Sequence, residues 1–367
     1  MSIQSPFLTP SHRRRRREAA LHRRRRRRRV TTLIAATLAL AVVAVVLLVS
    51  QDKSSRAGGA GTAARHHASR HSATKLAVAR PAHSPIGLTL GRPPLTLGLA
   101  ATGDPVQLPF HHPPLAGLLF DLDTGRVLWQ REPLKRMRIA SLTKMMTALL
   151  TVTSAKADEP VLVTKQAVDS AGSKVGVLPL GKHVRLETML YGLLLPSGND
   201  AAAALAQHVA GSISRFVVRM NEEAAKLGMG CTRYSSPSGY IDLGNFSCAA
   251  DLAVLAHVDL AQPRLARIVR TAKAVLPLPI KGGKIYLYNN NPLLRYRYPG
   301  TTGLKTGFTL AAGDCLVGTA ERGGVRLGVV LLHSSALGTQ ARQLLDAGFE
   351  RVYHQPPVKE PPIPPGA

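Results

Sequence analysis

Ile139-Ala140-Ser141-Leu142-Thr143-Lys144 places a serine at the start of a predicted helix and a lysine three positions later. Residues i and i+3 share one face of a helix, so the amine of Lys144 can lie beside the hydroxyl of Ser141. A serine hydroxyl is a weak nucleophile until a base takes its proton. Lysine can be that base if burial or a nearby cation lowers its pKa. The stretch therefore predicts a nucleophile and its base.

The spacing alone is a weak signal, because Ser50/Lys53 and Ser72/Lys75 repeat it. Only the pair at Ser141 is followed, in order, by Ser197-Gly198-Asn199 and Lys305-Thr306-Gly307, each of which occurs once in the chain. The alternative is that Ser141 caps a helix and that Lys305 and Thr306 are ordinary strand residues. The complete ordered triple favours the catalytic interpretation.

The surrounding hydrophobic pattern predicts an α+β fold. Apolar runs flank Asp123-Thr124-Gly125 as in a hairpin, and helical periodicity begins at Ala140 and dominates residues 184–256. Strands at both ends with helices between them indicate an antiparallel sheet with flanking helices plus a helical subregion. Asp121, Asp123 and Asp200 fit turn and cap positions better than catalytic acids. The predicted later elements are strands at 303–308, 315–320 and 326–333, with a turn at Gly323-Gly324, and a helix at 340–353.

Positive charge is concentrated at the front of the chain, whose formal net charge is +27. Residues 1–113 hold 19 Lys/Arg against 3 Asp/Glu, a balance of +16, and residues 114–367 hold 29 against 18, a balance of +11. The arginine-rich segment 1–29 abuts an uncharged apolar segment, 30–50, of the length that spans a bilayer. We therefore predict a single-pass anchor with a cytoplasmic amino end and an extracytoplasmic catalytic domain, rather than a nucleic-acid partner. A cleaved signal peptide is the alternative.

The remaining boundaries follow from composition. Residues 51–113 are rich in Ala, Gly, Ser, His, Arg and Pro and predict a disordered tether. Residues 114–354 are expected to form the catalytic domain and the Pro-rich residues 355–367 a disordered tail. We expect no metal and no cofactor, since the histidines of the tether lack regular spacing; they are His66, His67, His71, His111 and His112.

The three cysteines carry little information. Cys231, Cys248 and Cys315 are an odd number without C-x-x-C spacing, so the sequence suggests neither a disulfide framework nor a zinc site. At least one thiol stays unpaired. The expectation is that they are small buried hydrophobic residues.

The three motifs, with their neighbours, resemble those of the low-molecular-mass penicillin-binding proteins, specifically the serine-type D-alanyl-D-alanine carboxypeptidases of peptidase family S11. The likeness extends past the first motif through Met145-Met146-Thr147 and past the second through Asp200-Ala201-Ala202. Around the third it includes residues 298–309 with Ala312-Gly313 shortly after. It covers nearly all of residues 114–353 and implies the fold shared by β-lactamases and DD-peptidases.

The resemblance implies catalytic roles for three residues. Ser141 attacks the carbonyl of the penultimate D-alanine of a peptidoglycan stem peptide and forms an acyl-enzyme. Lys144 is the base, with Lys305 as the cation that lowers its pKa, and Ser197 relays the proton to the leaving amine. β-Lactams, which imitate the D-alanyl-D-alanine end, would acylate the same serine.

Substrate-binding roles are implied for the other motif residues. Asn199 holds the substrate's amide, and Lys305 and Thr306 bind its terminal carboxylate. The strand continues through Gly307 to Phe308, whose backbone N–H forms an oxyanion hole with that of Ser141.

The chain departs from the family pattern at two places. Ile139 stands where a proline is frequent, and Ser236-Pro237-Ser238-Gly239-Tyr240 replaces an Asn-Pro-x-Gly-Leu element. Three other functions stay open: a DD-endopeptidase with the same machinery, a serine β-lactamase and a non-catalytic wall-binding module. The deacylating Glu-x-x-Leu-Asn of class A β-lactamases has no match, since Glu222 and Glu223 lack that pattern.

Overall fold

The computed structural model describes residues 95–99, 103–240 and 243–358 of the chain. All described residues belong to one compact unit, residues 84–367. The predicted arginine-rich segment 1–29 and apolar segment 30–50 lie outside the described residues. In the part that the structure describes, no helix is long and apolar enough to cross a membrane.

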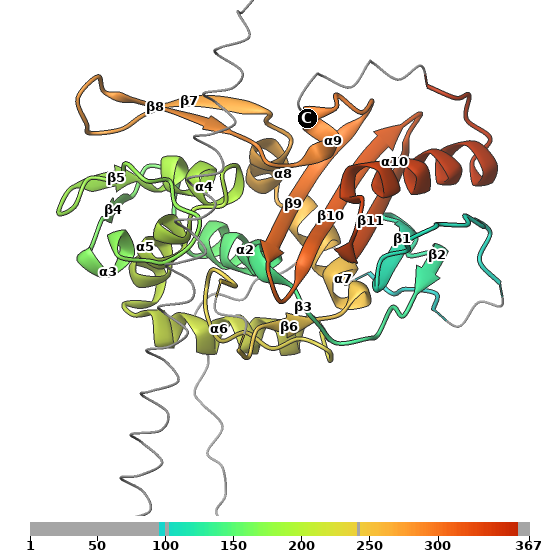
Figure 1. Ribbon diagram of the computed structural model, residues 1–367. Coiled ribbons are helices and arrows are strands. Elements are labelled where there is room, and N and C mark those ends of the chain that lie inside the picture. The colour runs from blue at the N-terminus through green and yellow to red at the C-terminus, as the bar shows by residue number, and fades with distance from the viewer. Residues whose placement is uncertain (1–94, 100–102, 241–242, 359–367) are drawn as a thin grey trace, which may run out of the picture. The chain divides into compact units, whose positions relative to one another are not determined.

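A five-stranded antiparallel sheet forms the centre of the described unit (Figure 1). Its strands stand in the order β2 (Val127–Arg131), β1 (Ala116–Asp121), β11 (Val325–Ser334), β10 (Gly313–Arg322) and β9 (Thr301–Thr309). The first strand pairs with the last, Ala116 opposite Leu332, so the two ends of the domain meet in one sheet. The α+β prediction is confirmed.

The helices lie mainly between β2 and β9 in sequence, as expected. The order is η1 (Ala140–Thr143), α2 (Lys144–Ser154), α3 (Lys165–Val168), α4 (Leu186–Leu194), α5 (Asn199–Ala210), α6 (Ile213–Lys226), α7 (Ala249–Leu260), α8 (Pro263–Val269) and α9 (Pro292–Arg295). α10 (Leu337–Ala347) follows the sheet and runs on into the π-helical turn η2 (Gly348–Val352). Three small ladders were not predicted: β3 (Met137–Arg138) with β6 (Phe246–Ser247), β4 (Pro160–Leu162) with β5 (His183–Arg185), and β7 (Lys273–Pro277) with β8 (Lys284–Tyr288).

Both faces of the sheet are buried. Alternate residues of each strand point to opposite faces, so neighbouring residues enter different cores. On one face Leu118 and Val330 join the larger core, which includes residues of α2, α5 and α7. On the other face Leu119 and Leu331 pack with residues of α10, which lies across the sheet in Figure 1. Residues of the helical region and the sheet thus share the larger core, and the site lies where they meet.

The folded part begins earlier than residue 114, so the predicted tether is wrong for its last described residues. Val106 is fully buried, and its N–H donates to the carbonyl of Leu128 at 2.9 Å. Asp104 accepts a hydrogen bond of 2.9 Å from the N–H of Gln130 in β2. These contacts are long-range, and local composition does not encode them.

The predicted tail likewise begins inside the fold. The backbone N–H of Gln355 donates to the carbonyl of Phe349, and its side-chain amide donates to the carbonyl of Arg322. A disordered tail from residue 355 is therefore wrong for its first residues, and 359–367 lie outside the described residues.

Cys231 and Cys248 form a disulfide, which the sequence analysis did not anticipate. Their Cα atoms lie 5.7 Å apart, within the range that a disulfide can bridge. Their separation of 17 residues carries no recognisable signal, so only the fold brings the two sulfurs together. Cys315 takes no part in the disulfide and is buried, as expected. Among the described residues the one cluster with the spacing of metal ligands is Cys231, Cys248 and Asp251, and its two sulfurs are already joined.

Candidate active site

Ser141 lies in the 3₁₀ turn η1, and Lys144 is the first residue of α2. Side chains three residues apart eclipse one another in a 3₁₀ turn, which places the lysine directly beside the serine. The Nζ of Lys144 donates to Ser141 Oγ at 2.8 Å and to the carbonyl oxygen of Ser238 at 2.8 Å. Ala140, immediately before the nucleophile, has a φ of +46°, an uncommon conformation that marks functional sites. The predicted nucleophile and base are thus in contact.

Lys144 is fully buried, and its pKa lies well below the usual 10.5. Burial is the largest cause, the positive charge of Lys305 adds to it, and the carboxylate of Asp200 opposes both. A lowered pKa leaves part of the lysine as neutral amine, the form that can take a proton from Ser141. The positive charge of Lys305 thus lowers the pKa of Lys144, as the sequence analysis predicted.

Lys305 is itself buried, and burial lowers its pKa to about 7. Its Nζ donates to the carbonyl oxygen of Thr306 at 2.8 Å. One donor of the amine is therefore taken by the backbone of β9 itself.

The second motif forms the turn that leads into α5. Ser197 has a φ of +68° and is 6% exposed, and its hydroxyl has no hydrogen-bond partner within the described part of the chain. The Oδ1 of Asn199 is likewise buried and unpartnered there, while its Nδ2 donates to the carbonyl of Ala171 at 2.6 Å. Buried polar atoms without partners are rare, and they fit positions that a substrate fills.

Asp200 holds the loop before this turn. Its carboxylate accepts from the backbone N–H groups of Val175 at 2.9 Å, Gly176 at 3.1 Å and Ala201 at 2.9 Å. Asp200 lies in the first turn of α5, whose cap is Gly198, so its carboxylate binds backbone N–H groups of the preceding loop and does not cap the helix. Asp121 likewise accepts from the N–H groups of Asp123 and Thr124 in the β1–β2 turn.

The third motif lies on β9, at the edge of the sheet beside the nucleophile. A Cβ at Gly307 would stand 2.9 Å from the backbone N of Ser141 and 2.9 Å from the carbonyl oxygen of Ile139. Only glycine lets this strand approach the nucleophile's backbone so closely. The N–H of Ser141 and β9 are thereby adjacent, as an oxyanion hole made from both requires.

The three motifs line one cleft of about 450 Å³, although they are 56 and 164 positions apart in sequence. Lys144, Lys305 and Asn199 are buried and are not part of this lining, whereas Phe308 is 59% exposed. The motif residues that line the cleft are Ser141, Ser197, Thr306, Gly307 and Phe308.

Arg295, which the sequence analysis did not single out, also lines this cleft. It ends the short helix α9 just before β9, and its side chain is exposed. Among the described residues it has no ion-pair partner. No motif signals it, because its place beside Thr306 depends on how α9 packs against the sheet.

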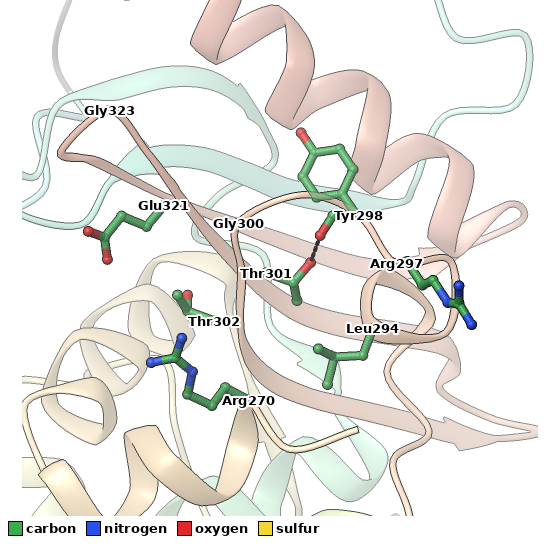
Figure 2. A pocket seen from close by; sticks show the side chains of 9 residues that line it. All are labelled: Arg270, Leu294, Arg297, Tyr298, Gly300, Thr301, Thr302, Glu321 and Gly323. Atoms are coloured by element: carbon green, nitrogen blue, oxygen red, sulfur yellow. Dashed lines mark hydrogen bonds between the residues drawn. The ribbon is translucent and has the colours of Figure 1, made fainter. Parts of the chain in front are cut away.

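A larger hollow, of about 590 Å³, lies at the opposite end of β9 (Figure 2). Thr301 and Thr302 line it together with Arg270, Arg297 and Glu321. None of the three motifs contributes to it. The nucleophile–base pair assigns the chemistry to the cleft that contains Ser141.

Residues 111–336 match the family model described as D-alanyl-D-alanine carboxypeptidase. The match spans 226 of the 367 residues and includes all three motifs.

The chain is similar to named relatives and to solved structures. It is 32% identical to the D-alanyl-D-alanine carboxypeptidase DacF of Bacillus subtilis over 68% of this chain and 65% of that protein. It is 35% identical to a D-alanyl-D-alanine endopeptidase of Pseudomonas aeruginosa over 55% of this chain and 65% of that protein. The crystal structure of the Streptomyces K15 DD-transpeptidase superposes with a TM-score of 0.62 and 30% identity, over 66% of this chain and 99% of that one. The chain thus spans about two thirds of the length of the two relatives.

Proposed function

The chain belongs to the D-alanyl-D-alanine carboxypeptidase family, peptidase S11, and from this premise we propose that it removes the terminal D-alanine from peptidoglycan stem peptides. The observation that carries the proposal is the hydrogen bond of 2.8 Å between Lys144 Nζ and Ser141 Oγ, made by a buried lysine of lowered pKa. A binding module has no need of such a pair.

In the first step the neutral amine of Lys144 takes the proton of Ser141, whose oxygen attacks the penultimate D-alanine carbonyl. The N–H of Ser141 and the adjacent β9 backbone at Phe308 stabilise the oxyanion, and each such donor contributes roughly 10²–10³ in rate. The amide C–N bond then breaks, and the proton returns through Ser197 to the leaving amine of D-alanine. Water hydrolyses the ester at Ser141 and releases the shortened peptide.

We assign the terminal carboxylate to Thr306 and Arg295, because both line the cleft and Arg295 brings an exposed cation. An arginine can meet a carboxylate with two parallel hydrogen bonds. Lys305 adds positive charge from its place on β9 and lowers the pKa of Lys144.

A fluorescent penicillin tests the acyl-enzyme, and a pentapeptide stem tests the reaction. We expect covalent labelling at Ser141 and release of one D-alanine, both lost in Ser141→Ala. Equal labelling of that variant would refute the assignment. No labelling and no turnover by wild type would favour the wall-binding module.

The same experiment separates the related reactions. A cross-linked dimer is the substrate for an endopeptidase, which one relative is named as. Rapid loss of the penicillin label would indicate a β-lactamase. Glu223 does not serve as that enzyme's deacylating base, because it lies on α6 and pairs with Lys226 at 3.0 Å.

We further propose that residues 30–50 anchor the catalytic domain to the outer face of a membrane. The apolar run and the arginines before it support this. The Cys231–Cys248 disulfide supports an extracytoplasmic location, because disulfides persist in oxidising compartments. Protease added to spheroplasts should degrade the region after Gln51 and spare the arginine-rich end. A mature protein that begins between residues 50 and 70 would instead establish a cleaved signal peptide.

A further inference from the structure

The segment between α6 and α7 forms a wall against the catalytic lysine. The disulfide between Cys231 and Cys248 joins its two ends. Its described parts are residues 231–240 and 243–248. We refer to these described parts as the disulfide-closed segment.

This segment supplies the second hydrogen-bond partner of Lys144. The carbonyl oxygen of Ser238 accepts from Nζ at 2.8 Å. A carbonyl can only accept, so it holds one N–H of the amine in either protonation state. In the neutral form the amine can then turn its lone pair to Ser141 and accept the proton of that hydroxyl. One turn further along α2, the hydroxyl of Thr147 donates to the carbonyl of Pro237 at 2.7 Å. The segment is thus attached at two successive carbonyls to the helix that carries the base.

The segment also fits closely against the nucleophile's own turn. Gly239 has a φ of +73°, and a Cβ there would stand 1.9 Å from the carbonyl oxygen of Ala140. The hydroxyl of Ser236 accepts from the N–H of Gly239 at 3.0 Å and from the Nδ2 of Asn245 at 3.0 Å. A small displacement of this turn therefore moves the Ser238 carbonyl away from the amine.

The ends of the segment are held at α7. Cys248 is fully buried and is the residue that precedes this helix. The N–H of Cys231 and the hydroxyl of Thr232 donate to Asp251 of α7 at 2.8 and 2.6 Å. The disulfide thus closes the segment at the place where the packed helix begins.

We propose that the Cys231–Cys248 disulfide is a positioning element of the active site: it holds the Ser238 carbonyl against the amine of Lys144, so that the rate of acylation depends on the intact disulfide. This inference rests on the proposed function, because it concerns the base of that same reaction. Lys305 on β9 and Asp200 on α5 are the charged groups that act on the Lys144 amine from the other elements.

The expected effect has a definite sign. Burial is the largest cause of the lowered pKa of Lys144. A loosened segment admits water to the amine, which raises its pKa towards the ordinary value. The neutral amine is the active form, so the acylation rate rises with pH as the amine loses its proton; we call this rise the acid limb. A higher pKa of Lys144 moves the acid limb to higher pH.

The double variant Cys231→Ser/Cys248→Ser tests this in the full chain, with the rate of acylation by a fluorescent penicillin measured from pH 5.5 to 10. We expect the midpoint of the acid limb to rise by at least half a pH unit, and the rate at a pH on that limb to fall about threefold for each half unit of the shift. Wild type reduced with dithiothreitol, which converts the disulfide to two thiols, should behave in the same way. Leu344→Ala, in the core on the far face of the sheet, is a control variant that lowers stability without touching the segment. Its acid limb should lie at the same pH as that of wild type.

Gly239→Ala keeps the disulfide but displaces the segment, and it should reproduce the shift even if the double variant fails to fold. An unchanged limb and rate in reduced wild type and in Gly239→Ala would overturn the inference while leaving the proposed function intact. Absence of acylation in oxidised wild type would instead overturn the proposed function.

Discussion

Gly307→Ala is the substitution whose effect the structure defines most directly. The added Cβ would lie 2.9 Å from both the N of Ser141 and the carbonyl oxygen of Ile139, about 0.5 Å inside the 3.4 Å at which ordinary contact begins. Both neighbours are backbone atoms, which cannot rotate away. β9 and the nucleophile's turn must therefore separate. A misplacement of 1 Å can cost about 10²-fold in rate. For the displacement of about 0.5 Å expected here, the larger effect is the loss of one oxyanion donor, which costs roughly 10²–10³.

We expect acylation of Gly307→Ala by a fluorescent penicillin to fall at least 10²-fold. The free energy of unfolding should change by no more than about 1 kcal/mol, because alanine reduces the freedom of the unfolded chain and partly offsets the strain. Gly318→Ala is the matched control on the neighbouring strand, where the added Cβ meets the end of the flexible Leu293 side chain at 2.9 Å. It should lose some stability but retain acylation. If Gly307→Ala acylates within threefold of wild type, the close approach of β9 to Ser141 is not what the site requires.

Three other substitutions or treatments have defined outcomes. Arg295→Ala should lower kcat/KM on a free-acid peptide by about 10- to 10²-fold and reduce the preference for acid over amide, whereas Arg297→Ala, which lines the other hollow, should not. Lys305→Met should lose activity. In wild type, the free energy of unfolding measured by chemical denaturation should rise between about pH 7 and 10.5, and this rise should be smaller in Lys305→Met. That rise follows because the folded-state pKa is about 7, so the unfolded state binds more protons in this window. Reduction of Cys231–Cys248 should lower the free energy of unfolding by about 3 kcal/mol, measured by urea titration with and without dithiothreitol, and an unchanged midpoint would contradict it.

The sequence by itself determined the catalytic elements and the fold class. Ser141 and Lys144 are three residues apart, so local geometry alone brings them together once the turn forms. The short apolar runs of β10 and β11 and the turn at Gly323-Gly324 are equally local, which is why these strands were predicted. The order of the three motifs then identified the family that the comparisons confirm.

Only the tertiary structure decided how the site is completed. The Ser238 carbonyl on Lys144, 94 residues away, the disulfide and the presence of Arg295 in the cleft all depend on contacts between distant segments. The same holds for the contact of Val106 with β2, which shows that the folded domain begins before the predicted residue 114. The lowered pKa of Lys144 belongs with these features, because burial and the charge of Lys305 cause it and neither exists until the chain is packed. A sequence pattern reports which groups are neighbours along the chain, whereas desolvation and long-range contact arise only from the packed fold.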